Sequence, residues 1–331
     1  MISTDANTAK PPWSVSLHRS MRTCQRRFAF QHLIASGVAK DDFRRRAYVA
    51  KQSQELSAWQ GHIVHDVLAH EFVAEVRQGR YPQLDDLTSA ANKLLKQQLE
   101  FSRSRRYEEM GVSKAAAERS YCVLSVHRQG GDIDADAIDD MRVAIGNCLG
   151  FILGQADFIR LLLRSQELQA ESSLRFFVAE WPVRATLDLV FKDPKGQLWI
   201  VDWKIAKSLT SDYSHQLRLY ALAVLRSGRW GTLNLNQIKL VEANLLQMRL
   251  TQHPLNEANL AQAEDFAFRG IVELRELVGS ESDHSVLLDD LDTANSPATC
   301  GHCAFAELCI EALVKAGRNR EAEVIQGTLF Y

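Results

Sequence analysis

A change of hydrophobic period between residues 183 and 204 constrains the fold most strongly. Apolar side chains alternate with other residues from Val183 to Leu189, a turn-forming run follows from Asp193 to Gly196, and a second largely apolar run ends at Lys204. A period of two is typical of a strand with one buried face, and Pro with Gly favours a tight turn. These residues therefore predict a β-hairpin.

Most of the remaining chain has the 3.6-residue period of helices. The first helix is expected from about Met21 to Ser36, with Ser20 as its N-cap and Cys24 one turn inside it. The further expected elements are helices over 53–78, helical periodicity over 84–171, a helix over 211–226 ending at Gly228, a strand over 238–250, a helix over 259–278, an acidic loop over 281–292 and a last helix to 316.

Two carboxylates are expected to converge in the hairpin. With the turn centred near residue 195, Asp188 lies within about one residue of facing Asp202. Two carboxylates about 4 Å apart repel by about 4 kcal/mol at an effective dielectric of about 20, and a hard divalent cation removes that penalty. Mg²⁺ or Mn²⁺ is the expected occupant, beside Lys204. An ordinary solvated sheet surface, with Lys204 as a surface partner, would use the same residues and stays open.

Four motifs occur in a fixed order along the chain. They are Gly61-x-x-x-His65, Asp188 at a strand end, Asp202-x-Lys204 and Gln216-x-x-x-Tyr220. The ordered set resembles the PD-(D/E)XK nucleases of the RecB-like branch, which includes the nuclease domains of RecB and AddB and the CRISPR-associated adaptation exonucleases. The resemblance covers residues 14–315. It departs from the family at Leu187, where a Pro often precedes the Asp, and in the long helical stretch before Asp188.

The resemblance implies metal-dependent hydrolysis of phosphodiester bonds. The implied metal ligands are His65, Asp188, Asp202 and the backbone carbonyl of Trp203. Lys204 would orient or help to deprotonate the attacking water and offset charge in the transition state. Gln216 and Tyr220 would position the site or the DNA backbone.

The resemblance also implies a restriction-endonuclease-like α/β fold, with a mixed sheet core flanked by helices, a large helical insertion and a C-terminal cysteine cluster. The implied parts are a flexible tail over 1–13, N-terminal helices over 14–65, the insertion over 66–175, the nuclease core over 176–280, and the acidic loop, cysteine cluster and last helix over 281–331.

Three of the six cysteines lie within ten residues, which favours a metal site over disulfides. They are Cys300, Cys303 and Cys309, and a metal centre needs a fourth ligand. The resemblance implies that Cys24 supplies it and that the four thiols hold a [4Fe-4S] cluster. Zn²⁺ bound by the three with Cys24 or His302, or no metal, are the alternatives. The other two cysteines are expected to be buried small side chains: Cys122 and Cys148.

The overall charge excludes a global electrostatic attraction to nucleic acid. Lys and Arg total 39 against 41 Asp and Glu, a net charge of −2, so a polyanion must be held by local basic surface. The candidate phosphate contacts are Arg19, Arg22, Arg26, Arg103 and Arg106. Such clusters are often simply solvated faces.

The function expected from these observations is a metal-dependent DNA nuclease, an exonuclease or single-strand-acting enzyme of DNA repair, recombination or anti-phage defence. Its substrate would be single-stranded DNA or DNA ends. The sequence has no Gly-x-x-x-x-Gly-Lys-[Ser/Thr] loop, so a helicase or other ATPase, repair or defence subunit is the expected partner. The alternative is a non-catalytic DNA-binding scaffold with an iron–sulfur cluster. No apolar run reaches 18 residues, so a cytoplasmic protein without a membrane span is expected.

Overall fold

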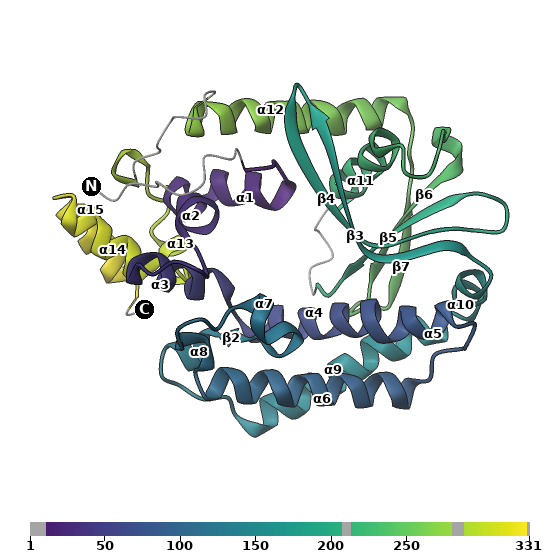
Figure 1. The fold of residues 1–331 in the computed structure, drawn as a ribbon, viewed down its shortest axis with the longest axis horizontal. Coiled ribbons are helices and arrows are strands. Elements are labelled where there is room, and N and C mark those ends of the chain that lie inside the picture. The colour runs from purple at the N-terminus through teal and green to yellow at the C-terminus, as the bar shows by residue number, and fades with distance from the viewer. Residues whose placement is uncertain (1–10, 207–212, 280–287, 330–331) are drawn as a thin grey trace. The chain divides into compact units, whose positions relative to one another are not determined.

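The computed structural model describes residues 11–206, 213–279 and 288–329 (Figure 1). The chain forms two compact units, each assembled from separate stretches of sequence. The first, here called the cysteine unit, comprises Met1–Gln54, Gln98–Gly131 and Arg269–Tyr331. The second, here called the sheet unit, comprises Glu55–Gln97 and Asp132–Phe268. Two helices have residues in both units: α6 (Leu84–Arg103) and α12 (Glu257–Val278).

A five-stranded mixed sheet forms the core of the sheet unit (Figure 1). In spatial order its strands are β3 (Gln166–Val178), β4 (Trp181–Lys192), β5 (Leu198–Lys204), β6 (Ile238–Asn244) and β7 (Arg249–His253). Neighbouring strands are antiparallel, except that β5 and β6 are parallel. Parallel neighbours cannot be joined by a tight turn, so α11 (Ser214–Ser227) makes the crossover between them. This arrangement is consistent with the expected restriction-endonuclease-like fold.

The predicted hairpin is confirmed as β4 and β5. Its turn is held by the Asp193 carboxylate, which accepts hydrogen bonds from the backbone N–H groups of Lys195 and Gln197 at 2.8 and 2.9 Å. Gly196 has a φ of +77°, a conformation that glycine adopts without strain. The strands pair with Leu189 opposite Val201.

Both faces of β5 are covered by helices. On one side, α11 packs against the sheet through a buried apolar face and ends, as predicted, before Gly228, which has a φ of 63°. On the other side, Phe158 of α10 (Ala156–Leu163) meets the rings of Phe191 and Trp203 edge-on, with centroids 6.3 Å apart in both pairs. The neighbours Ile200 and Val201, which point to opposite faces, are both 0% exposed.

The other helical elements of the sheet unit come from both of its sequence segments. They are α4 (Leu56–Val67), a π-helical turn at Leu68–Phe72, α5 (Val73–Arg77), α9 (Ala135–Gly154), α10 and a 3-10 turn at Leu235–Gln237. Within the described residues no single helix is long and apolar enough to cross a membrane. The bent pair of α9 and α10, at 69°, meets the length and composition criteria only as a pair.

Two expectations about the sheet unit were wrong. Helical structure ends at Leu163 rather than near 171, and β3 begins at Gln166. The first half of β3 is polar, and only its second half shows the alternation of a strand, with Leu174, Phe176 and Val178 buried. The single strand predicted over 238–250 is two antiparallel strands, β6 and β7.

The cysteine unit is mostly helical (Figure 1). Its elements are α1 (Val15–Thr23), α2 (Gln25–Ala29), a π-helical turn at Phe30–Ile34, α3 (Asp42–Gln52), β1 (Ser53–Gln54), 3-10 turns at Arg106–Glu108, Glu118–Ser120 and Leu288–Asp290, α7 (Lys114–Ala117), β2 (Val123–Leu124), α8 (Ser125–Arg128), α13 (Ala298–Gly301), α14 (Ala306–Lys315) and α15 (Asn319–Thr328). The strands β1 and β2 pair in parallel. One apolar cluster of this unit joins Val49, Phe101, Tyr107, Tyr121 and Val123.

The helix predicted from Met21 is two helices with an earlier start. Ser14, not Ser20, is the N-cap of α1, and its hydroxyl accepts a hydrogen bond from the Leu17 N–H at 3.2 Å. The chain is extended at Cys24, with a φ of −168°, so this cysteine lies between α1 and α2. Ser14 and Ser20 are equally good capping residues, so the sequence alone does not choose between them. Parts of the predicted tail, acidic loop and 211–226 helix lie outside the described residues.

Candidate functional site

The hairpin brings two carboxylates and a lysine together at one end of the sheet. Since Leu189 faces Val201, the next antiparallel positions are Asp188 and Asp202. Asp202 is 1% exposed, and its Oδ2 lies 2.5 Å from the Lys204 Nζ. Asp188 Oδ2 accepts a hydrogen bond from the backbone N–H of Trp203 at 2.8 Å. The register thus places the two carboxylates at adjacent cross-strand positions, close enough for the charge of Asp202 to raise the pKa of Asp188.

The first half of α11 holds the lysine and Asp202 in place. Gln216 Oε1 accepts a hydrogen bond from Lys204 Nζ at 3.1 Å, while its Nε2 donates to Asp202 Oδ1 at 3.3 Å. Gln216 Nε2 also contacts the Tyr220 hydroxyl, one turn along the same helix. The Lys204 Nζ lies 4.7 Å from the centre of the Tyr213 ring, a cation–π contact that the sequence did not point to.

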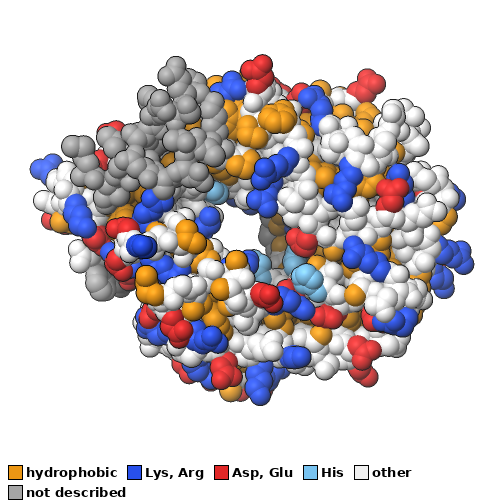
Figure 2. Space-filling view, in the orientation of Figure 1, with side chains coloured by type: hydrophobic (Ala, Val, Ile, Leu, Met, Phe, Trp, Pro, Cys, Tyr) orange, Lys and Arg blue, Asp and Glu red, His pale blue; other side chains and the backbone are white. Residues whose placement is uncertain are grey.

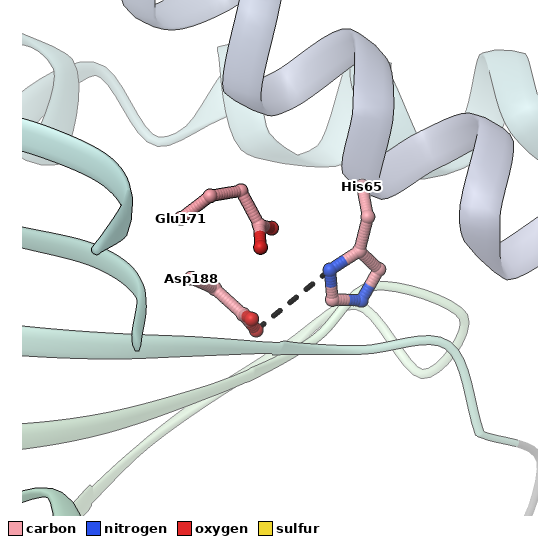
Figure 3. A group of neighbouring side chains, drawn as sticks. All are labelled: His65, Glu171 and Asp188. Atoms are coloured by element: carbon pink, nitrogen blue, oxygen red, sulfur yellow. Dashed lines mark ion pairs between the residues drawn. The ribbon is translucent and has the colours of Figure 1, made fainter. Parts of the chain in front are cut away.

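The imidazole of His65, on α4, lies beside Asp188 (Figure 3). Its Nδ1 is 3.8 Å from Asp188 Oδ2. Burial, followed by the charges of Lys204 and His62, lowers the pKa of His65 to about 4, although a hydrogen bond with the Trp203 backbone acts in the opposite direction. The ring is therefore neutral at pH 7 and offers a nitrogen lone pair, the form in which histidine binds metal ions.

A third acidic residue, Glu171 on β3, joins this group (Figure 3). One ligand atom from each of His65, Glu171 and Asp188 lies within 4.8 Å of the other two. The pairing of Ala170 with Leu189 places Glu171 beside Asp188 on the neighbouring strand. Sequence reasoning missed Glu171 because it expected helix up to this residue. Had the β3–β4 pairing been recognised, the register would have indicated it.

The electrostatics of the group favour a bound cation. Burial and then the nearby Asp202 charge raise the pKa of Asp188 well above its usual value. Burial likewise raises the pKa of Asp202, and Lys204 opposes that rise. One neutral imidazole and several carboxylate oxygens form a donor set that suits Mn²⁺ or Mg²⁺. These donors therefore fit a divalent metal ion. Asp202 lies outside the group of three but occupies the cross-strand position next to Asp188.

The family model of the PD-(D/E)XK nuclease superfamily matches residues 12–310. This chain belongs to that superfamily. No curated protein matches the chain. A solved structure titled "Crystal structure of SSO0001" is 16% identical to this chain in sequence, covering 66% of this chain and 94% of its own, with a TM-score of 0.28. At that TM-score the likeness carries no argument about this chain.

The cysteine unit of this superfamily member gathers four thiols. Cys300 lies in α13, Cys303 follows it, Cys309 lies in α14, and Cys24 joins α1 to α2. All four line one pocket. Burial, followed by the charges of the other three thiols, raises the pKa of Cys300 to about 11. As predicted, the two other cysteines are buried: Cys122 and Cys148.

Four cysteine thiols that line one pocket form a ligand set that suits either a tetrahedral Zn²⁺ ion or an iron–sulfur centre.

The five arginines considered as DNA contacts differ in exposure. Arg19, Arg22, Arg103 and Arg106 are exposed. Arg26 is 0% exposed, so the expected contact of this residue with DNA is wrong for this structure. On the face drawn in Figure 2, basic and acidic side chains are interspersed over the described residues, in keeping with the small net charge.

Substituting Asp188 with Asn should stabilise the metal-free protein. A raised carboxyl pKa means that the folded state binds the proton more tightly, so the free energy of unfolding falls as pH rises above the unfolded pKa of about 4. At pH 8 the metal-free Asp188→Asn variant should melt about 2 °C or more above the unmodified protein. Its melting temperature should no longer rise on adding Mn²⁺, as measured by scanning calorimetry.

Asp193→Asn is the matched control in the same hairpin. Burial acts to raise the pKa of Asp193, but hydrogen bonds from Trp199 and from the backbone of Gln197 and Lys195 hold it below its usual value. This substitution should therefore lower the melting temperature and leave the response to Mn²⁺ intact. A metal-free Asp188→Asn protein that melts below the unmodified one would contradict the charge-repulsion account.

Proposed function

We propose that this chain is a divalent-metal-dependent nuclease of the RecB-like branch that hydrolyses DNA phosphodiester bonds. The observation that carries the proposal is the convergence of Asp188, Asp202 and Lys204 at the end of one hairpin, beside His65 and Glu171. Carboxylates, an imidazole and an ammonium group at one point are the groups that metal-assisted hydrolysis of a phosphodiester needs.

The side chains divide this chemistry between them. His65, Asp188 and Glu171, with Asp202 beside them, would hold Mg²⁺ or Mn²⁺, and the Trp203 carbonyl is a further candidate ligand. A bound divalent ion lowers the pKa of a coordinated water and polarises the phosphoryl oxygen. Lys204 is the only one of these groups that carries a fixed positive charge, so it would orient the attacking water and stabilise charge on the phosphate in the transition state.

The contacts of Lys204 support that assignment. The ammonium forms an ion pair with Asp202 and donates a hydrogen bond to Gln216, while the Tyr213 ring lies alongside. The side chain is 15% exposed, so it is held firmly and still reaches the surface of the site. Gln216 and Tyr220 act as positioning residues, because their hydrogen bonds end on Lys204, on Asp202 and on each other.

Removing either charged partner should abolish cleavage. Asp202→Asn or Lys204→Met should lower the rate of DNA hydrolysis in Mg²⁺ or Mn²⁺ by about 10² or more. Asp202→Asn removes a carboxylate charge beside the metal, and Lys204→Met removes the positive charge that stabilises the phosphate in the transition state. The assay compares linear single strands, blunt duplexes and circular single strands, with EDTA as the metal-free arm. Asp193→Asn, in the same hairpin but hydrogen-bonded within the turn, should retain cleavage.

The same assay separates this function from its alternative. Unmodified protein that cleaves no DNA or RNA with any divalent metal, while still binding nucleic acid, would favour a non-catalytic scaffold. We expect linear single strands to be cut faster than blunt duplexes, since a duplex hides its individual strands. An ATP-driven helicase or another repair or defence subunit would relieve that limit, because this sequence has no nucleotide-binding loop of its own.

Glu171 should act as a metal ligand. Glu171→Gln keeps the size of the side chain but replaces a charged oxygen, so the affinity for Mn²⁺ should fall by about tenfold or more. The measurement is a titration of Mn²⁺ followed by electron paramagnetic resonance. Glu167→Gln is the control on the same strand, because Glu167 only forms a surface ion pair with Lys192 at 3.0 Å. Equal Mn²⁺ affinities for the two variants would show that Glu171 is not a metal ligand.

We also propose that Cys24, Cys300, Cys303 and Cys309 hold a [4Fe-4S] cluster. The shared pocket of the four cysteines supports a common metal centre, and the resemblance to cluster-bearing RecB-like nucleases is the reason to prefer iron–sulfur to zinc. Such a crosslink joins residues 276 positions apart, and loop closure over that distance removes on the order of 5 kcal/mol of unfolded-state freedom. The first role of the cluster is therefore to stabilise the cysteine unit.

The cysteines divide into two groups that a substitution series should separate. Protein purified without oxygen should be brown and contain about four irons per chain. Cys24→Ser should lose the iron, because it removes one of four ligands, whereas Cys122→Ser and Cys148→Ser should retain it. Iron and zinc analysis with visible absorption is the measurement. Stoichiometric zinc without iron would show that the cysteines hold a zinc ion and not a cluster.

A further inference from the structure

A fully buried arginine lies against the four thiols. Arg26, on α2, is 0% exposed and lines the same pocket as the cysteines. Its Nε–H donates a hydrogen bond to Cys309 Sγ at 3.2 Å, and its Nη1 donates to the Leu288 carbonyl at 2.7 Å. A guanidinium is always charged, so burying it without a counterion costs free energy.

The described residues supply no such counterion. No carboxylate in 11–206, 213–279 or 288–329 forms an ion pair with Arg26, and its Nη2 has no hydrogen-bond partner among them. Glu321 lies near enough for its pKa to be lowered slightly by Arg26, after the stronger effect of Arg318. However, both oxygens of Glu321 already accept hydrogen bonds from Arg318, at 2.6 and 2.7 Å.

A second buried arginine of the same unit shows the contrast. Arg45 is 6% exposed, and its guanidinium donates to the backbone carbonyls of Gly37, Tyr107, Glu109 and Val112. Arg45 is thus a structural crosslink between loops. Arg26 instead directs its Nε–H at a sulfur atom. Each of the two arginines also has one buried nitrogen without a hydrogen-bond partner among the described residues, the Nη2 of Arg26 and the Nε of Arg45.

We infer that Arg26 is the built-in countercharge of the metal–thiolate centre and sets its reduction potential. This inference rests on the proposed cluster. Four thiolates around an oxidised cluster or a Zn²⁺ ion leave a net charge of about −2, which a buried guanidinium balances. When the cluster takes up one electron from an external donor, its charge becomes more negative. The N–H···S bond and the positive charge of Arg26 stabilise that reduced form and so raise the potential.

The decisive comparison is between Arg26→Gln and Arg45→Gln in the full-length, cluster-loaded protein. Dye-mediated redox titration under anaerobic conditions should show the ratio of reduced to oxidised cluster, at a fixed potential, at least tenfold lower in Arg26→Gln. For a one-electron couple this is a shift of about 59 mV to lower potential. Arg26→Lys, which keeps the charge, should shift less, and Arg45→Gln should not shift.

A second readout compares the loss of melting temperature in loaded protein with the loss in metal-stripped protein. Substituting a purely structural arginine would lower both by the same amount. Arg26→Gln should lower the melting temperature of the loaded protein more than that of protein stripped of metal, because only the loaded form supplies the countercharge. Arg45→Gln should lower both equally. Should Arg26→Gln fail to accumulate, the redox titration of Arg26→Lys against unmodified protein decides, since a changed N–H···S contact alters the potential without removing charge.

Failure of the Arg26 inference can be distinguished from failure of the cluster assignment. Loaded Arg26→Gln with an unchanged potential, or with equal losses of stability in loaded and stripped protein, would overturn the inference and leave the cluster standing. If the centre is zinc, the corresponding readout is the rate of zinc loss to a chromogenic chelator, which should rise at least tenfold in Arg26→Gln but not in Arg45→Gln. Protein that binds neither iron nor zinc would overturn the cluster and this inference together.

Discussion

The register between β4 and β5 is the constraint on which the candidate metal site depends. With Leu189 opposite Val201, Asp188 and Asp202 fall at adjacent cross-strand positions. Because side chains alternate between the two faces of a strand, a slip of one residue would carry Asp202 to the opposite face. The register is fixed by burial on both faces and by the tight turn that Asp193 closes with three hydrogen bonds. Apolar packing and turn chemistry thus determine where the charged groups meet.

This arrangement also explains the unfavourable electrostatics that the site tolerates. Asp202 is almost fully buried, and Asp188 has its pKa raised by burial and by its neighbour. The sheet has enough apolar contact on both faces to hold them there. A site whose charges repel in the absence of a cation, and which a cation stabilises, is preorganised for metal binding at some cost to the stability of the metal-free protein.

Much of the sheet unit could be predicted from sequence, because the relevant signals are local. The period-two alternation and the Asp193–Gly196 turn identified the hairpin, and the spacing of Gln216 and Tyr220 indicated one helix face. Glu171 was missed because β3 begins with polar residues whose pairing is visible only in three dimensions. The burial of Arg26 was missed for a similar reason: an arginine in a basic run predicts exposure unless a distant sulfur atom is known to lie beside it.

The nesting of the two units in the sequence has a consequence for synthesis on the ribosome. The sheet unit is complete at Phe268, whereas the cysteine unit needs both the first helices and the chain up to Cys309 and beyond. At about 5–20 residues per second, the last cysteine follows the end of the sheet unit by roughly 2–8 s. The N-terminal helices and Cys24 therefore remain without their C-terminal neighbours while the sheet unit can already fold. The four-cysteine pocket is the last part of the chain to be completed.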